Sequence, residues 1–129
     1  MTQLHLRVLL VGDNKKDRLC MLLALESAQI VVAQAGLIEE GMRHIQKGLT
    51  DVVVVDMHMR GGRGYDLVMW LWYAKQRFPL VMISADFSNH GYPPPRPRID
   101  RPLALLAKPF TDKSLLDAIR RVTAFSIKE

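Results

Sequence analysis

Short apolar runs alternate along the chain with longer segments in which apolar residues recur at helical spacing. The run DVVVVD at 51–56 is an example, because four consecutive valines lie between two aspartates. Runs of this length and β-branched content predict strands, and we expect five of them, at 6–11, 30–35, 51–56, 79–85 and 103–107. Apolar residues three or four positions apart predict helices at 14–28, 38–48, 65–78 and 111–125.

Individual residues predict where these helices begin, where they end and which side they bury. Gly48 is expected to cap the second helix, Pro79 to stop the third and Thr111 to be the N-cap of the last. In the first helix, four residues recur at helical spacing: Leu19, Leu22, Leu23 and Glu26. The inner face of the last helix is predicted to comprise Leu115, Leu116, Ile119 and Val122.

The strands are apolar at nearly every position rather than at alternate positions. Such strands belong to a parallel sheet that helices cover on both faces. The predicted fold class is therefore α/β, a doubly wound (βα)₅ three-layer sandwich with a five-stranded parallel sheet. In open sheets of this kind, ligands bind outside the carboxyl ends of the strands.

The connection at 86–102 departs from this pattern, because it holds five prolines and a glycine. Proline lacks an amide donor and interrupts a helix, so a short or broken helix is expected here, with an extended, polyproline-like segment at 93–102. A docking loop and a tolerated insertion are equally good interpretations of this proline-rich connection.

Composition and charge narrow the function classes only slightly. With 129 residues, 49% of them hydrophobic and 24% charged, the chain is expected to form one soluble domain. No apolar run approaches the ~20 residues of a membrane span, and the amino terminus lacks a signal peptide, so a cytoplasmic protein without membrane contact is expected. Cys20 is the single cysteine, which excludes an internal disulfide and suggests a buried thiol.

The net charge of +5 and the pI of about 9.7 have two interpretations. One is a surface for nucleic acid or an acidic partner, and the other is an arginine-rich exterior in contact with solvent. The basic residues form no long block. We therefore favour the second interpretation and do not expect direct nucleic-acid binding.

Polar residues gather at the predicted carboxyl ends of the strands. Asp13 follows the first strand, Asp56 ends the third, Ser84 lies at the fourth, and Lys108 follows the fifth. Each has a simple explanation alone, such as a helix cap or a solvated side chain, but together they should converge at one sheet edge. Two carboxylates favour a Mg²⁺ ion between them, a carboxylate can become an aspartyl phosphate, and a lysine stabilises phosphoryl oxygens.

Four motifs in order, RVLLVGDN, VVVVDMHM, VMISA and AKPF, resemble those of the CheY-like response regulator receiver domain of two-component signalling, with Gly64 eight positions after Asp56. The resemblance covers about residues 6–123 and implies a flavodoxin-like, CheY-like fold. It also implies the following roles: Asp56 as phospho-acceptor, Asp13 and the backbone carbonyl of His58 as Mg²⁺ ligands together with Asp56, Lys108 as phosphate-binding lysine, Ser84 as switch hydroxyl, and a cis Lys108–Pro109 bond.

The resemblance implies partners as well. A histidine kinase or phosphotransfer protein would donate the phosphoryl group, an output partner would receive the signal, and a homodimer through the last helix and strand is an option. The expected organisation is a single receiver domain at 1–129, with a core at about 6–125. No output domain is visible, so a stand-alone regulator and the receiver part of a longer protein both stay open.

The chain departs from the family pattern at several positions. Gly12 stands where the family has the first of two adjacent acids, so Mg²⁺ should bind more weakly; Lys15 and Lys16 either weaken it further or partly replace the cation. Arg60 replaces a common proline, which should make RGGRG more mobile. Leu105 replaces the aromatic residue whose rotation usually reports phosphorylation.

Two functions are therefore weighed. The first is a receiver that accepts a phosphoryl group on Asp56 and signals by a conformational change, without being an enzyme in the usual sense. The alternative is a receiver-like interaction module that works without regulated phosphorylation, which Gly12, Leu105 and the proline-rich connection favour. A third class, an enzyme or small nucleic-acid binder on the same fold, has no motif of its own.

Overall fold

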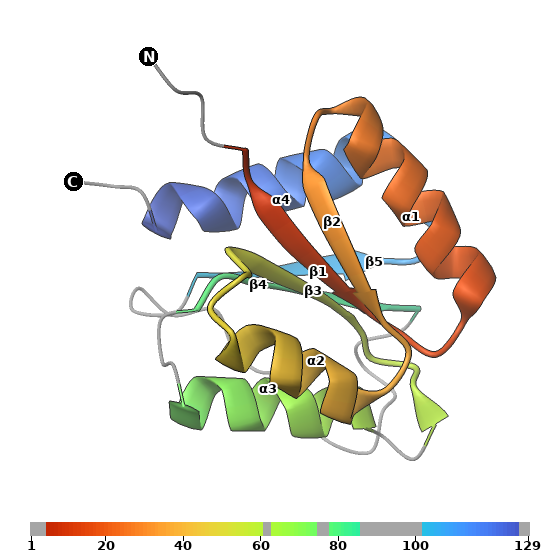
Figure 1. Ribbon diagram of the computed structural model, residues 1–129. Helices are drawn as coiled ribbons and strands as arrows, with labels where there is room; N and C mark the ends of the chain where they lie inside the picture. The colour runs from red at the N-terminus through yellow and green to blue at the C-terminus, as the bar shows by residue number, and fades with distance from the viewer. Residues whose placement is uncertain (1–4, 61–62, 75–77, 86–101, 127–129) are drawn as a thin grey trace.

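A computed structural model describes residues 5–60, 63–74, 78–85 and 102–126 of the chain (Figure 1). The strands are β1 (Arg7–Val11), β2 (Val31–Ala35), β3 (Val52–Asp56), β4 (Leu80–Ser84) and β5 (Leu103–Ala107). The helices are α1 (Lys15–Ser27), α2 (Ile38–Gln46), α3 (Arg63–Ala74) and α4 (Asp112–Ser126). The predicted elements are thus found within the described residues, with bounds that differ by a few positions.

The five strands form one parallel sheet in the order β2-β1-β3-β4-β5. This confirms the predicted α/β fold class. The strand order reverses between β1 and β3, since the chain proceeds from β1 to one side and later from β3 to the other. A crevice for ligands lies outside the carboxyl ends of the strands at such a reversal, and the β1–α1 connection and Asp56 lie on its two sides.

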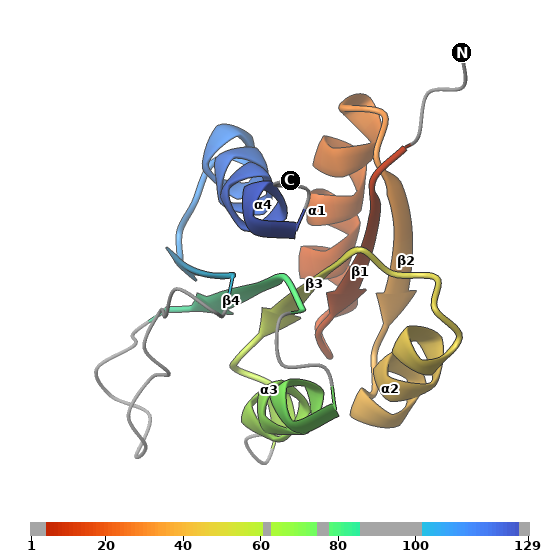
Figure 2. The same cartoon turned by 90° about the vertical axis from the view of Figure 1, so that its left-hand side faces the viewer.

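Helices α1 and α4 cover one face of the sheet, and α2 and α3 cover the other, as Figures 1 and 2 show from two directions. The valines of β3 alternate between these layers, with Val53 and Val55 packing toward α2 and α3 and Val52 and Val54 toward α1 and α4. All four are at most 1% exposed, and each buried side chain contributes roughly 1.5–3 kcal/mol of transfer free energy. The apolar run therefore holds the end of β3 rigidly between two packed layers.

Two of the predicted helix ends, at Thr111 and Gly48, are confirmed, whereas the predicted stop of α3 before Pro79 falls on residues 75–77, outside the described ranges. Thr111 caps α4, because its Oγ1 accepts the backbone N–H of Ser114 at 3.1 Å. Gly48 follows α2 with a φ of +73°, a conformation that favours glycine. Asn14 caps α1 by accepting the N–H of Asp17 at 2.9 Å.

The inner face of α4 agrees with the prediction, with one residue only partly buried. Leu115, Ile119 and Val122 are at most 1% exposed. Leu116 is partly buried against the same core cluster. The helical spacing of the apolar residues in α4 therefore identified the side that packs on the sheet.

The spacing of the apolar residues in α1 correctly predicted a helix but did not identify its buried side. Its buried residues are Met21, Ala24 and Leu25, whereas Leu19 and Leu23 are 48% and 58% exposed. The predicted buried thiol at Cys20 is wrong, because this cysteine is exposed. Two apolar stripes run along this helix, and the periodicity alone could not decide which of them faces the sheet.

Two predicted features fall mainly on residues outside the described ranges. The broken helix and polyproline-like segment lie within 86–102, of which the structure describes only Pro102, and the mobile turn RGGRG includes 61–62. The carbonyl of Pro102 accepts the N–H of Leu80 at 2.9 Å and so leads the chain into β5. None of the described helices is long and apolar enough to cross a membrane.

Candidate phosphoryl-acceptor site

Asp56 lies at the carboxyl end of β3, and the residue is 7% exposed. Its Oδ1 accepts the backbone N–H of His58 at 2.9 Å. Its Oδ2 accepts the ammonium group of Lys108 at 2.8 Å. Because each oxygen has a donor, the carboxylate is held in one orientation at the edge of the sheet.

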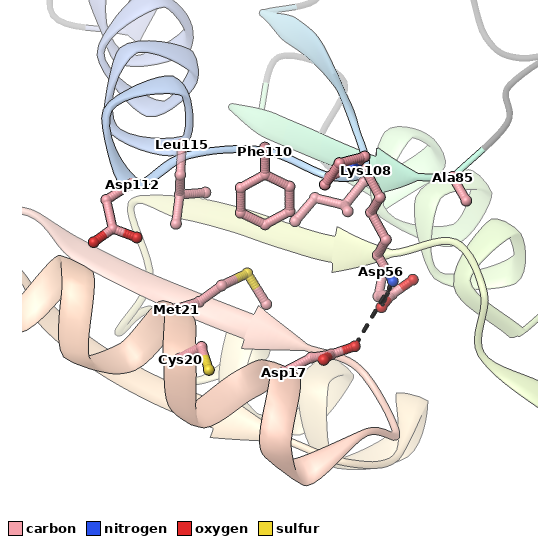
Figure 3. A pocket seen from close by; sticks show the side chains of 11 residues that line it. Asp17, Cys20, Met21, Asp56, Ala85, Lys108, Phe110, Asp112 and Leu115 are labelled. Carbon is pink, nitrogen blue, oxygen red and sulfur yellow. Dashed lines mark hydrogen bonds and ion pairs between the residues drawn. The ribbon is translucent and has the colours of Figure 1, made fainter.

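Lys108 follows β5 and reaches back to β3. Its backbone N–H donates to the carbonyl of Ser84 at 2.8 Å, and the peptide bond to Pro109 is cis, as the family resemblance implied. Its Nζ also lies 3.8 Å from the Oδ2 of Asp17 on α1, the pair joined in Figure 3. The lysine is therefore shared between two carboxylates, with Asp56 the nearer.

Asp17 is a site residue that the sequence did not reveal. It lies in the first turn of α1, and it lines a hollow of about 530 Å³ together with Asp56 and Lys108 (Figure 3). Met21, Phe110 and Leu115 form apolar parts of the same hollow. An aspartate three positions after a helix cap is an ordinary surface residue, and only the path of Lys108 brings it into the site.

Gly64 fixes how closely α3 approaches Asp56. A Cβ at this position would lie 2.7 Å from the carbonyl oxygen of Asp56 and 3.1 Å from the Cα of Met57. Both contacts are with backbone, which cannot yield in the way a side chain can. A glycine is therefore required where the first turn of α3 packs against the end of β3.

Ser84 is fully buried at the end of β4, beside β3 and β5. Its Oγ lies 3.3 Å from the Nε2 of His58. The same Nε2 accepts the backbone N–H of Ala85 at 2.9 Å. The family resemblance assigned a role to the backbone carbonyl of His58, but the structure adds its side chain, which spans from the end of β3 to the end of β4.

Asp13 lies on the neighbouring side of the sheet edge. It is exposed, and its Oδ2 accepts the backbone N–H of Arg60 at 3.0 Å. Together with Arg60 and Arg63 it lines a second hollow of about 590 Å³, whereas Asp56 and Lys108 line the first. The structure thus brings Asp56, Lys108 and the side chain of His58 toward Ser84, and it places Asp13 against the β3–α3 connection.

Gly12 lies directly against Asp56. A Cβ built there would be 3.2 Å from the Cβ of Asp56 and 3.9 Å from the Cγ of Arg18. The guanidinium group of Arg18 donates to the Gly12 carbonyl and its Nε donates to Gln34 at 3.3 Å. A basic side chain therefore runs past the position where a side chain at residue 12 would adjoin Asp56.

The donor set is chemically suited to a hard cation, although it is small. The carboxylates of Asp13 and Asp56 and the carbonyl of His58 are oxygen donors, which Mg²⁺ prefers, and Mg²⁺ commonly keeps several waters. Within the described ranges, no three His, Cys, Asp or Glu side chains are grouped closely enough to hold a metal ion. The chemistry of these oxygen donors suits Mg²⁺, but the described side chains form no ready-made metal site, and Asp13 and Asp56 line different hollows.

Leu105 occupies the β5 position where the family usually has an aromatic ring. It is partly buried and packs against the core cluster beneath α2 and α3. It offers no aromatic ring that could rotate between a buried and an exposed position. The end of β4 lies beside the site, where Ile83 pairs with Asp56 and the Oγ of Ser84 lies near His58.

A five-stranded parallel sheet in this order, with helices on both faces, belongs to the flavodoxin-like α/β class. The family model of the response regulator receiver domain matches residues 8–120, and the chain belongs to this family. Receiver domains are signalling domains of two-component systems rather than conventional enzymes. A search of curated proteins gave no match.

Solved structures agree with the fold. The chemotaxis protein CheY4 of Vibrio cholerae is 23% identical, with a TM-score of 0.77 over 92% of this chain and 99% of that one. A receiver protein from Pseudomonas putida is 20% identical, with a TM-score of 0.74 over 93% and 99%. TrrA from Thermotoga maritima, crystallised with Mg²⁺ and BeF, is 18% identical, with a TM-score of 0.76 over 91% and 98%.

Proposed function

We propose that this receiver domain accepts a phosphoryl group on Asp56 from a histidine kinase or a phosphotransfer protein. The observation that carries the proposal is the pair formed by a nearly buried carboxylate and a lysine, 2.8 Å apart, at the carboxyl edge of the sheet. A carboxylate oxygen would form the new bond to phosphorus while the bond between phosphorus and the donor imidazole breaks, and the leaving imidazole would take up a proton.

The residues around Asp56 have roles that follow from their charge and position. The ammonium group of Lys108 would lie beside the phosphoryl oxygens and offset the charge that they bring. The backbone N–H of His58 orients the carboxylate through Oδ1. The hydroxyl of Ser84 would bond a phosphoryl oxygen, and the resulting shift of β4 would carry the signal to an output partner.

Asp13, Asp56 and the carbonyl of His58 would hold a Mg²⁺ ion. When bound, the ion would supply positive charge to the phosphoryl oxygens during transfer. We propose that its affinity is low, because Gly12 removes one carboxylate and the Arg60 N–H already bonds Asp13. Asp13 would have to share or exchange that hydrogen bond with the cation.

A second function has specific support and is kept as the alternative. In it, the chain is a receiver-like interaction module that binds its partner without regulated phosphorylation. Gly12 in place of an acid, the Arg18 guanidinium on the Gly12 carbonyl, and Leu105 in place of an aromatic ring all favour this alternative. The retained Asp56, Ser84 and Lys108 favour phosphorylation.

Incubation with a small-molecule phosphodonor and Mg²⁺, followed by intact-mass measurement, separates the two functions. We expect the wild-type chain to gain the mass of one phosphoryl group and Asp56→Asn to gain none, because the amide is not a nucleophile toward phosphorus. Asp117→Asn, which removes a partly exposed carboxylate on α4 that pairs with Lys113, is the matched control and should be phosphorylated like the wild type.

Two results would contradict the proposal. The absence of any adduct in the wild type across a wide range of Mg²⁺ concentrations would favour the interaction module. An adduct that persists in Asp56→Asn would place the phosphoryl group on another residue.

A further inference from the structure

The imidazole of His58 bonds two groups at the end of β4 that a phosphoryl group could use. Its Nε2 accepts the backbone N–H of Ala85 at 2.9 Å and lies 3.3 Å from the Oγ of Ser84. A backbone N–H can only donate, so Nε2 is the accepting nitrogen and the ring proton is assigned to Nδ1. The Ser84 hydroxyl can then donate to the same nitrogen.

These two donors lie beside the acceptor. Ser84 is the residue that follows Ile83, the β4 partner of Asp56 in the sheet. Ala85 lines the same hollow as Asp56 and Lys108 (Figure 3). A phosphoryl group on Asp56 is rich in acceptor oxygens and poor in donors, so it would seek the same N–H and O–H groups.

We propose that the His58 imidazole is an internal competitor of the phosphoryl group for the donors of Ser84 and Ala85. In the unphosphorylated protein, Nε2 accepts the hydrogen bonds that a phosphoryl oxygen would otherwise accept. It thereby holds the end of β4 in place. A phosphoryl oxygen can bond Ser84 only after the imidazole withdraws. This inference rests on the proposed phosphorylation of Asp56 and makes His58 a positioning residue whose side chain opposes the switch.

The position of His58 makes such a withdrawal feasible. The side chain is exposed, so it can turn toward solvent without leaving a cavity in the core. Its backbone N–H stays on the Oδ1 of Asp56 in either case, because that bond does not depend on the side-chain rotamer. The competitor can therefore be removed by substitution while the acceptor carboxylate keeps its own hydrogen bonds.

Two substitutions distinguish the effect of the hydrogen-bond acceptor Nε2 from the effect of the size of the ring. His58→Phe keeps a ring of similar size but has no acceptor, whereas His58→Gln keeps an acceptor oxygen at the end of a flexible chain. His5→Phe, at an exposed histidine bonded to the carbonyl of Gln29 at the opposite edge of the sheet, is the matched control for a surface phenylalanine.

Beryllofluoride with Mg²⁺ is the probe, because it mimics the phosphoryl group and binds reversibly. We expect His58→Phe to bind it about three- to tenfold more tightly than the wild type, which is the range that one net hydrogen bond supplies. His58→Gln and His5→Phe should bind within about twofold of the wild type. The amide resonance of Ala85 in an ¹⁵N spectrum recorded without the probe should shift in His58→Phe, and less in His58→Gln.

The outcomes distinguish this inference from the function on which it rests. Equal beryllofluoride affinity in the wild type and His58→Phe would overturn the competition and leave phosphorylation of Asp56 standing. An unchanged Ala85 amide resonance in His58→Phe would overturn it as well. If neither the wild type nor any variant binds beryllofluoride, and none is phosphorylated, the proposed function fails and the inference fails with it. Binding by His58→Phe alone would support both the proposed function and the competition.

Discussion

At the scale of single residues, the site is defined as much by a missing side chain as by those present. Gly12 leaves the flank of Asp56 open, and a Cβ placed there would approach the acceptor's own Cβ to 3.2 Å. That distance is tight but is between side chains, so a shift of a few tenths of an ångström would relieve it. The loss of the acid thus reduces the negative charge around the acceptor without an evident packing requirement for glycine.

Gly12→Asp should therefore strengthen Mg²⁺ binding. A third carboxylate beside Asp13 and Asp56 adds negative charge and an acceptor for metal-bound water, and we expect roughly a tenfold gain in affinity. Titration of Mg²⁺ followed by calorimetry measures it. Gly12→Ala is the control, since it adds the Cβ contact without the charge; equal affinities of the two variants would show that charge at position 12 does not limit metal binding.

The sequence predicted some site residues and missed others for a physical reason. Asp56 and Lys108 could be paired in advance because parallel strands end at a common edge. Asp17 and the side chain of His58 could not, because their contacts depend on the rotation of α1 and on the conformation of a short turn. Asp13 was expected beside Asp56, but its Oδ2 bonds the N–H of Arg60, and its role as a metal ligand stays a prediction.

At the scale of elements, an ion pair ties the start of β1 to the residue before β3. At the edge opposite the site, Arg7 donates to Asp51 from its backbone N at 2.8 Å, from Nε at 3.1 Å and from a terminal nitrogen at 2.9 Å. The Arg7 side-chain hydrogen bonds lower the pKa of Asp51, and burial opposes this effect. The pair fixes the register of the two strands whose other ends flank the acceptor.

Asp51→Asn should lower the free energy of unfolding at neutral pH by about 1 kcal/mol, a modest value because both side chains are over a third exposed. Since the folded-state pKa lies below the ordinary 3.8, the carboxylate's contribution is complete above that value and disappears as pH falls through the folded-state pKa. Urea unfolding at neutral pH and well below pH 3.8 measures this. A stability difference that persists in acid would contradict the ion-pair explanation.

Whether a segment forms a strand or a helix was easier to predict than which of its sides is buried. The continuous apolar run of β3 could belong only to a strand covered on both sides, and its alternate valines do enter the two opposite layers. In α1 the leucines at 19 and 23 compete with Met21 and Leu25 for the buried side, and the structure buries the second pair. Which of the two stripes is buried depends on how the β1–α1 connection sets the rotation of the helix. This rotation cannot be predicted from the sequence of the helix alone.

At the scale of the whole molecule, the residues that stabilise the fold and the residues of the site lie at different parts of the sheet. Its interior and its amino edge hold the apolar clusters and the Arg7–Asp51 pair, whereas its carboxyl edge holds Asp56, Lys108 and His58. The packed strands hold Asp56 in place, and under the proposed function the connections around it would respond to the charge of a phosphoryl group. This division suits the proposed phosphorylation switch.

The position of the phosphoryl group tests the central claim most directly. After incubation with a phosphodonor and Mg²⁺, borohydride reduces an aspartyl phosphate to homoserine and releases phosphate, so the modified residue can be found by peptide mass spectrometry. The prediction is homoserine in place of Asp56, and at no other aspartate, in the wild-type chain. Homoserine at a different position, or none in a folded and phosphodonor-treated protein, would contradict the assignment of Asp56 as the acceptor.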